Sequence, residues 1–359
     1  MCSSDLDVIT ADPIHPWNQG SGYLFTAEYY AIAKQRLDTG GVMCQWLPLY
    51  GLSVENFKSI VATFSDAFPY SMLWQNVTDA VLIGSDSPIR IDLANLTRRL
   101  KEPSVAAQLE PIGLADPYSL LAEVALQQTS IREYARGAII NTDDNLRVEF
   151  SSPFDIGTPA MLRNIAELNR YRGRVEERLD FLVLSDAERE AVARSRRAKF
   201  ETLNVALSRT PPQEKVRSLR RILREHPDYR RARRLLAKLR AQRGVDEMHR
   251  SGPEQALGFL EEAVMLDPWS ADAHRKLGAA FLLSGHFDEA IQSLERSMEL
   301  RPGRWKTHSL LARAQLGAGR ADEAKASLRT AAEINPHNPG LAAWLARLQS
   351  GGTRRSAGG

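Results

Sequence analysis

A spacing of 34 residues recurs through the last third of the chain. The positions that keep it are Pro268, Pro302 and Pro336, Ala256, Ala290 and Ala324, Leu260, Leu294 and Leu328, and Leu277, Leu311 and Leu345. A period of this length indicates one helical unit stacked several times, because a single unit cannot bury its apolar face alone. Proline closes each unit, since it removes a helix hydrogen bond and clashes with the preceding turn. The spacing therefore restricts this region to an all-α repeat architecture.

The best-formed unit covers residues 271–302 and has small residues where two helices must cross closely. Gly278 lies on its first helix and Ala290 on its second. The pattern resembles tetratricopeptide repeats, and the resemblance implies an α-solenoid whose groove binds a peptide or partner protein. The alternative is that the array packs against its own chain or self-associates. Four residues are considered as groove-facing, without being assigned to a site: His274, Lys276, Arg313 and Gln315.

The array extends beyond these regular units in both directions. We expect a degenerate half-unit near 213–226, and then an irregular unit with seven extra residues around 242–252. A terminal helix is expected at 339–349. The repeat array is therefore predicted over residues 211–350, followed by a disordered tail at 351–359 that is rich in Gly, Ser and Arg.

The first fifty residues have the pattern of one parallel β-α-β unit. A β-branched strand at 6–10 precedes Asp12, and a helix is expected at 26–37. A second apolar strand at 42–46 follows two glycines and contains Gln45. Because ligands of open α/β sheets bind outside the carboxyl ends of the strands, Asp12 and Gln45 are candidate ligand-facing residues.

Several short motifs within residues 7–150 follow an order typical of one enzyme family. They are Asp7-Val8-Ile9, Asp12, His15-Pro16, Leu24-Phe25, Tyr29-Tyr30, Gly41, Gln45, Trp74, a strand at 79–85 and the segment 141–150. In this order they resemble the C-terminal half of the catalytic domain of spermidine synthase-like proteins (polyamine aminopropyltransferases), class I transferases on a Rossmann-like sheet. The segment 141–150, expected as a turn and then a strand at 146–150, resembles bacterial versions fused to a membrane domain.

The resemblance implies that Asp12 is catalytic and accepts a proton from an attacking amine such as putrescine. That amine then attacks the methylene next to the sulfonium of decarboxylated S-adenosylmethionine, the family's co-substrate. Gln45 and His15 are the candidate substrate- or cofactor-binding residues. His15 stands where the family has a second acid, and an imidazole is a poor ligand for an ammonium group.

Each candidate also has a purely structural interpretation. Asp12 can start a turn, as Asp-Pro steps commonly do, and His15 can order its own loop. Gln45 can end a strand that packs on a helix. Tyr29 and Tyr30 lie on a predicted helix, where aromatic side chains are more often part of a core than of a cofactor site.

The start of the chain leads to a separate hypothesis. Residues 1–6 match the translation of a sequencing-adapter end, and the family carries its glycine-rich cofactor loop upstream of the part that corresponds to residues 7–150. We therefore expect residues 1–6 to be a non-native leader, and this chain to be an inactive fragment of an aminopropyltransferase-like parent. The alternative is a non-catalytic scaffold in which the repeats carry the function and the α/β part is a relic.

Composition places no membrane-spanning helix within this chain. The 359 residues are 43% hydrophobic, but no apolar run reaches the roughly 18 residues that a span needs. The two cysteines, Cys2 and Cys44, favour a reducing cytoplasm over a disulfide framework. Membrane attachment, at the inner membrane, is expected only through a missing N-terminal part of the parent. No Cys and His residues have the spacing of metal ligands, so no metal is expected.

A helical connector is expected at 151–210, with basic residues near its end: Arg189, Arg194, Arg196, Arg197 and Lys199. A basic helix can bind nucleic acid or the anionic inner leaflet of a membrane. Nucleic acid is disfavoured because acids are interspersed, the net charge is only +3 and no aromatic side chains alternate with the cations. The expected fold is thus α/β and then all-α: a partial Rossmann-like sheet of the class I AdoMet-transferase type, a helical connector and a tetratricopeptide-repeat α-solenoid.

Overall fold

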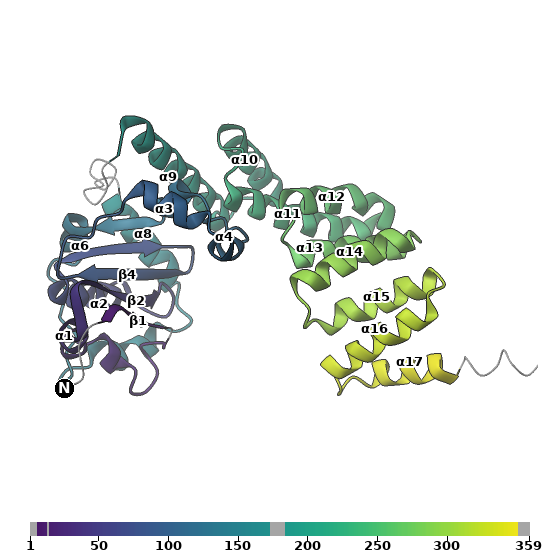
Figure 1. Ribbon diagram of the computed structural model, residues 1–359, viewed down its shortest axis with the longest axis horizontal. Helices are drawn as coiled ribbons and strands as arrows, with labels where there is room; N and C mark the ends of the chain where they lie inside the picture. Colours follow the sequence, from purple (N-terminus) through teal and green to yellow (C-terminus); the bar gives the residue numbers. More distant parts are fainter. Residues whose placement is uncertain (1–5, 13, 173–183, 351–359) are drawn as a thin grey trace, which may run out of the picture. The chain divides into compact units, whose positions relative to one another are not determined.

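The chain folds into an α/β unit followed by a helical unit (Figure 1). The computed structural model describes residues 6–12, 14–172 and 184–350. The two compact units are residues 1–199 and residues 200–359, and the division falls inside helix α9 (Asp186–Leu207). The predicted order of an α/β part and then an all-α part is confirmed. Residues 1–5 of the predicted leader and the predicted tail lie outside the described residues.

The first unit contains a five-stranded mixed sheet with the order β1-β2-β4-β3-β5. The strands are β1 (Leu6–Ala11), β2 (Leu37–Pro48), β3 (Tyr70–Gln75), β4 (Asp79–Ser85) and β5 (Val124–Gln127). β1 pairs with β2 in parallel, whereas the other pairs are antiparallel. Helix α1 (Ala27–Arg36) connects the parallel strands, so the predicted β-α-β unit is confirmed.

Local interactions explain where α1 begins and how closely β2 approaches β1. The Thr26 hydroxyl accepts the backbone N–H of Tyr29 at 3.3 Å, which satisfies one of the free donors at the start of the helix. A Cβ atom at Gly41 would lie 2.9 Å from the carbonyl oxygen of Leu6. Only glycine therefore allows β2 to pass so near to β1.

Helix α2 (Val54–Ala67) supplies much of the apolar core of the first unit. Its side chains Phe57, Ile60 and Phe64 are fully buried. A Cβ atom at Gly84 of β4 would lie 2.5 Å from the Phe64 ring, so this helix packs closely on the sheet. Burial of each such side chain contributes about 2 kcal/mol.

A short helix replaces the strand predicted at 146–150, so that prediction was wrong. Helix α7 (Arg147–Ser151) forms because side chains bind the backbone groups that a strand would use. The Asn145 Oδ1 atom accepts the N–H of Arg147 at 3.0 Å, and Asn141 Oδ1 accepts that of Val148 at 3.1 Å. Leu146, with φ 38°, interrupts any extended strand. The other helical elements of this unit are η1 (Gly22–Phe25), α3 (Leu93–Leu100), α4 (Pro103–Leu109), α5 (Pro117–Leu121), α6 (Gln128–Tyr134), η2 (Ser152–Asp155) and α8 (Ala160–Arg172).

Asn141 joins four elements that are far apart in the sequence. Its side chain is fully buried, and its Nδ2 donates to the carbonyl oxygen of Phe25 at 3.1 Å. Its backbone N–H donates to Thr63 Oγ1 at 2.9 Å, and its carbonyl oxygen accepts the N–H of Ala27 at 2.9 Å. Together with the bond from Val148, these contacts connect η1, α1, α2 and α7.

Buried charges anchor helix α9 to the sheet. The Lys199 Nζ atom lies 3.2 Å from Glu123 Oε2, and the exposed fractions of the two side chains are 3% and 6%. The same ammonium donates to the carbonyl oxygens of Gln75 and Ala122. Arg196 is also buried. The basic end of the predicted connector is therefore partly an internal anchor, because Arg196 and Lys199 do not lie on its surface.

The described part of the second unit consists of helices that pack in consecutive pairs (Figure 1). They are α10 (Pro212–Glu225), α11 (Arg230–Arg250), α12 (Pro253–Leu266), α13 (Ala271–Leu283), α14 (Phe287–Leu300), α15 (Trp305–Gly317), α16 (Ala321–Ile334) and α17 (Pro339–Ser350). A Cβ atom at Gly278 would lie 2.6 Å from Leu294 Cγ, so the small residue permits the close crossing predicted from the sequence.

The seven extra residues of the irregular unit lie elsewhere than predicted. A Cβ atom at Gly244 would lie 2.6 Å from Leu260 Cγ, which repeats the contact of Gly278 with Leu294 at the regular interval. The region around 242–252 therefore keeps the repeat register. The additional residues lengthen the start of α11, where seven residues are about two helical turns and leave the buried face unchanged.

We expect Asn141→Leu to destabilise the first unit by about 3 kcal/mol, because the Phe25 carbonyl and the Val148 N–H lose their partners. Urea denaturation of the full chain followed by tryptophan fluorescence measures the loss. Asn95→Ala is the control, since Asn95 is an exposed amide on α3. Equal stability of the two variants would contradict the joining role of Asn141.

We expect Lys199→Met to cost about 3 to 5 kcal/mol, because it leaves the buried Glu123 carboxylate without its ammonium partner. The double variant Lys199→Met with Glu123→Leu should recover most of the loss, since neither charge then remains buried. Amide hydrogen exchange in α9 and β5 measures both effects. Lys101→Met, at an exposed position, is the control. A double variant as unstable as the single one would show that the pair does not anchor α9.

Candidate functional site

The residues predicted from the β-α-β pattern meet at the carboxyl ends of β1 and β2. Asp12 follows β1 directly and is exposed. Its carbonyl oxygen accepts the N–H of Ile14 at 2.7 Å, so the chain turns immediately after the strand. Ala11 is paired with Gln45 in the parallel ladder, which brings the Asp12 and Gln45 positions to the same edge.

Four aromatic rings gather beside this edge. We call His15, Trp17, Trp46 and Tyr50 the aromatic cluster. The His15 ring centroid lies 4.6 Å from that of Trp17, 5.5 Å from that of Trp46 and 5.9 Å from that of Tyr50. The rings meet edge-on or tilted, a geometry that aromatic pairs prefer. The cluster thus combines the end of β2 with the loop that follows β1.

Direct contacts hold the aromatic cluster together. His15 Nε2 lies 3.3 Å from the Tyr50 hydroxyl. Burial raises the pKa of Tyr50, and the nearby Asp79 carboxylate raises it further, so the hydroxyl stays protonated at neutral pH. Gly51 has φ +64°, and a Cβ atom there would lie 2.5 Å from the Trp17 ring. A glycine is therefore required under Trp17.

Gln45 has an internal role in the first unit. Its side chain is 2% exposed, and its Oε1 accepts the Tyr30 hydroxyl at 3.4 Å. Its Nε2 donates to the carbonyl oxygen of Trp46. Tyr30 is fully buried, and burial raises the pKa of its hydroxyl far above the usual range, with the neighbouring Tyr29 as a second cause. Gln45 orders the strand end beneath the aromatic cluster.

The loop after the aromatic residues is held by a carboxylate from α7. Glu149 Oε1 accepts the N–H of Gly20 at 3.1 Å, and Glu149 Oε2 accepts the N–H of Gly22 at 2.9 Å. The Ser21 hydroxyl donates to the carbonyl oxygen of His15 at 2.6 Å. The segment predicted at 141–150 thus positions the loop that carries His15.

The structure places Asp12 and Gln45 at one edge of the sheet, but the Gln45 side chain is buried against Tyr30. His15 instead contacts Trp46, the next residue, which points to the opposite face of the strand. Trp17, Tyr50 and Glu149 were not identified from the sequence. The signal for the two aromatic residues was their place in the loops that follow the two predicted strands, because such loops meet at one edge of the sheet. The described residues contain no group of three His, Cys, Asp or Glu side chains that could hold a metal.

A second candidate surface lies on the first helices of the repeat pairs. Each helix buries one face against its neighbours and leaves the opposite face accessible. On α13 the unburied positions Asp272, Arg275, Lys276, Ala279 and Leu283 fall within one arc at 100° per residue, and α13 contacts both α11 and α15. We call these positions the A-helix face: Lys238, Gln242, Val245, His249, Asp272, Arg275, Lys276, Ala279, Leu283, Lys306, Ser309, Leu310, Arg313 and Gly317.

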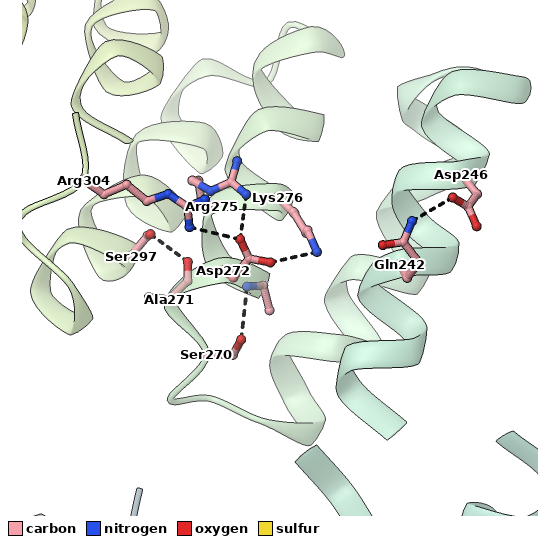
Figure 2. A network of polar contacts seen from close by, with 10 residues as sticks. Gln242, Asp246, Ser270, Ala271, Asp272, Arg275, Lys276, Ser297 and Arg304 are labelled. Atoms are coloured by element: carbon pink, nitrogen blue, oxygen red, sulfur yellow. Dashed lines mark hydrogen bonds and ion pairs between the residues drawn. The ribbon is translucent and has the colours of Figure 1, made fainter. Parts of the chain in front are cut away.

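One carboxylate organises the cations at the centre of the A-helix face (Figure 2). Asp272 Oδ1 accepts Arg275 Nη2 at 2.6 Å, and Asp272 Oδ2 accepts Lys276 Nζ at 2.8 Å. Arg304, just before α15, lies 3.3 Å from the same carboxylate. Partial burial opposes ionisation of Asp272, but the bonds from Lys276 and Arg275 outweigh it and lower the pKa to about 2. One negative charge therefore holds three positive ones.

The residues considered as groove-facing divide into two groups. Lys276 and Arg313 belong to the A-helix face. His274 is buried and donates its Nε2–H to the carbonyl oxygen of Pro268 at 3.1 Å, as His308 does to that of Pro302 at 3.0 Å. Gln315 is buried as well and accepts the Ser327 hydroxyl. His274 and Gln315 therefore stabilise the repeats themselves.

Comparisons with known proteins identify the repeats. Residues 253–314 match one family model of the tetratricopeptide repeat, and residues 306–338 match a second. Among solved structures, the tetratricopeptide-repeat domain of Arabidopsis OM64 is 23% identical, over 33% of this chain and 98% of that domain, with a TM-score of 0.32. The first such domain of human RPAP3 is 17% identical, over 32% and 90%, with a TM-score of 0.31.

MamA from Desulfovibrio magneticus RS-1 is 19% identical, over 43% of this chain and 84% of its own, with a TM-score of 0.33. No curated protein matches the chain. Both matching family models lie within the second unit. Because of these two matches, we conclude that the second unit contains tetratricopeptide repeats, as the 34-residue spacing predicted. In the part of the chain that the structure describes, no helix is both long and apolar enough to cross a bilayer.

We expect the Asp272 carboxylate to make the stability of the second unit depend on acid pH. Its pKa is about 2 in the folded chain and 3.8 without these contacts, so its contribution is complete above pH 4 and is lost as the pH falls toward 2. Since the group is half-exposed, we expect about 1 kcal/mol or less. Urea denaturation of wild type and Asp272→Asn against pH measures it, and the two curves should converge near pH 2. A constant difference, or one as large for Asp322→Asn at an exposed site, would contradict this.

Proposed function

We propose that this chain is a protein-interaction scaffold whose A-helix face binds a peptide or a partner protein. The observation that carries the proposal is a continuous accessible face on helices whose opposite faces are buried. Stacked repeats present such a face as an extended surface, because each unit contacts only its neighbours. The matches of residues 253–338 to tetratricopeptide-repeat models support the same function.

The charge of the A-helix face selects the chemistry of the partner. The face carries five cations, Lys238, Arg275, Lys276, Lys306 and Arg313, against one anion, Asp272, which makes a net charge of +4. Val245, Leu283 and Leu310 add apolar surface between these charges. Electrostatic complementarity favours a segment of opposite charge and excludes like-charged ones. We therefore assign the face to an acidic segment with apolar anchors.

Synthetic peptides test this function. We expect a fluorescein-labelled peptide of alternating Glu and Leu to bind the full chain, and its counterpart with Gln in place of Glu to bind at least tenfold more weakly. Lys306→Glu with Arg313→Glu should weaken the first peptide by a similar factor in fluorescence anisotropy. Arg329→Glu, at an exposed position of α16, is the matched control. Equal binding of both peptides, or equal effects of the face and control variants, would refute an acidic partner.

A second candidate function is aminopropyl transfer, as the sequence resemblance implies. The aromatic cluster favours it, because ring faces attract an ammonium group and Asp12, an exposed acid, follows β1 at the edge of the sheet where the cluster lies. The parallel pair β1 and β2 is consistent with part of a Rossmann-like sheet. His15 in place of an acid leaves Asp12 as the proposed charge partner of a putrescine-like amine.

In this proposal, decarboxylated S-adenosylmethionine is the donor. The amine nitrogen forms a bond to the methylene beside the sulfonium, the carbon–sulfur bond breaks, and its electron pair stays on sulfur as a thioether. Asp12 accepts the proton that the nitrogen loses. Gln45 supports the site by ordering the end of β2, and His15 by holding Tyr50 and Trp17 in the aromatic cluster.

Amine binding separates this candidate from a purely structural cluster. We expect putrescine to bind the chain in calorimetry, and Asp12→Asn or Gly51→Ala to weaken it at least fivefold, the latter because it displaces Trp17. Tyr23→Leu, an exposed aromatic residue outside the cluster, is the control. Absence of binding, or equal binding by all variants, would remove the amine site from this chain.

A further inference from the structure

Residues 150–156 expose their apolar side chains, whereas Ser152 is buried and Ser151 and Asp155 are half-buried. The exposed fractions of Phe150, Phe154 and Ile156 are 67%, 84% and 55%, whereas Ser152 is fully buried. This pattern is the reverse of a normal surface segment, in which apolar side chains turn toward the core. Burying these three side chains against a partner would therefore remove a large apolar area from contact with water.

Polar contacts with the start of α2 hold the segment in this orientation. Asp155 Oδ2 accepts the backbone N–H of Ser53 at 2.7 Å and the Asn56 Nδ2 at 3.0 Å. The Ser151 hydroxyl donates to Asn56 Oδ1 at 2.8 Å. Asn56 is itself 2% exposed. The inward polar side chains thus fix the backbone, and the outward apolar ones are presented before any partner binds, which lowers the entropy lost on binding.

The charge around the segment limits what can cover it. Residues 143–156 contain four acids and one cation, Arg147, which makes a net charge of −3; Asp143 and Asp144 are exposed, whereas Glu149 and Asp155 are half-buried and bonded inward. An anionic lipid surface attracts basic segments and would repel this one. The same charge disfavours pairing of the segment with itself, since two like-charged patches would then face each other. A partner that covers this segment therefore needs a surface in which apolar side chains lie among positively charged ones.

We infer that the exposed segment 150–156 of one copy of this chain docks on the A-helix face of a second copy. That face carries a net charge of +4 and has Val245, Leu283 and Leu310 between its cations, so it complements the segment in both charge and apolar surface. Because two different surfaces meet, the contact is heterologous and can continue from copy to copy. The inference rests on the proposed function of the A-helix face and names its partner.

Sedimentation velocity of the full chain tests the inference. We expect wild type to associate between about 1 and 100 μM, and less so at high salt because the contact is charged. Phe150→Ser with Phe154→Ser removes the segment's anchors, and Lys306→Glu with Arg313→Glu reverses the A-helix face. Each double variant alone should associate at least tenfold more weakly. Both changes are at unburied positions.

An equimolar mixture of the two double variants is the decisive sample. Each contributes the surface that the other lacks, so the mixture should form a one-to-one dimer. Met265→Ser, which alters a side chain that is 74% exposed on α12, should associate like wild type. A monomeric wild type overturns the inference, and so does self-association of the A-helix-face variant, which would indicate pairing through the segment alone.

Two results separate this inference from the function on which it rests. A monomeric wild type that still binds the acidic peptide keeps the peptide-binding function and removes the second copy as its partner. A monomeric wild type that cosediments with phosphatidylcholine vesicles, and loses this with Phe154→Ser, would assign the segment to a lipid surface instead and also overturn the inference.

Discussion

The buried side chain of Asn141 is the interaction on which the first unit depends. It bonds to the carbonyl of Phe25 and the N–H of Val148, while its backbone bonds to Thr63 and Ala27. Because leaving a buried amide without its hydrogen-bond partners is costly, these bonds fix η1, α1, α2 and α7 together. The segment after Asn141 can then reach both the loop of the aromatic cluster, through Glu149, and the start of α2, through Asp155.

The two candidate surfaces differ in how they are built. The aromatic cluster and the exposed segment 150–156 depend on single polar contacts between distant parts of the chain, such as those of Glu149 and Asp155. The A-helix face depends on repetition, because each close crossing, as at Gly278 and Leu294, recurs after 34 residues. Loss of one polar contact should therefore displace a whole site in the α/β part, whereas loss of one helix crossing should disturb only one repeat of the array.

The sequence predicted best where a pattern is local or periodic. The strand at 79–85, predicted from the family resemblance, and the helix expected at 26–37 were placed correctly, since both are continuous local segments. The predicted strand at 146–150 was wrong because the side chains of Asn141 and Asn145 accept backbone N–H groups there. Residue propensities do not predict such side-chain bonds to the backbone. The prediction placed the seven extra residues of α11 at the wrong end of the helix. Seven residues add about two helical turns, so the buried face of α11 keeps the repeat register and the pattern does not reveal where they were added.

For this protein, the sequence by itself determined the order of the two fold classes, the repeat period and the charge of the helices, because these depend on local pattern and composition. It also brought Asp12 and Gln45 to one edge of the sheet. Only the tertiary structure decided that Gln45 and Lys199 are buried, that Trp17 and Tyr50 join His15, and that Phe154 faces outward. Those outcomes depend on contacts between residues far apart in the chain, whose partners no local pattern specifies.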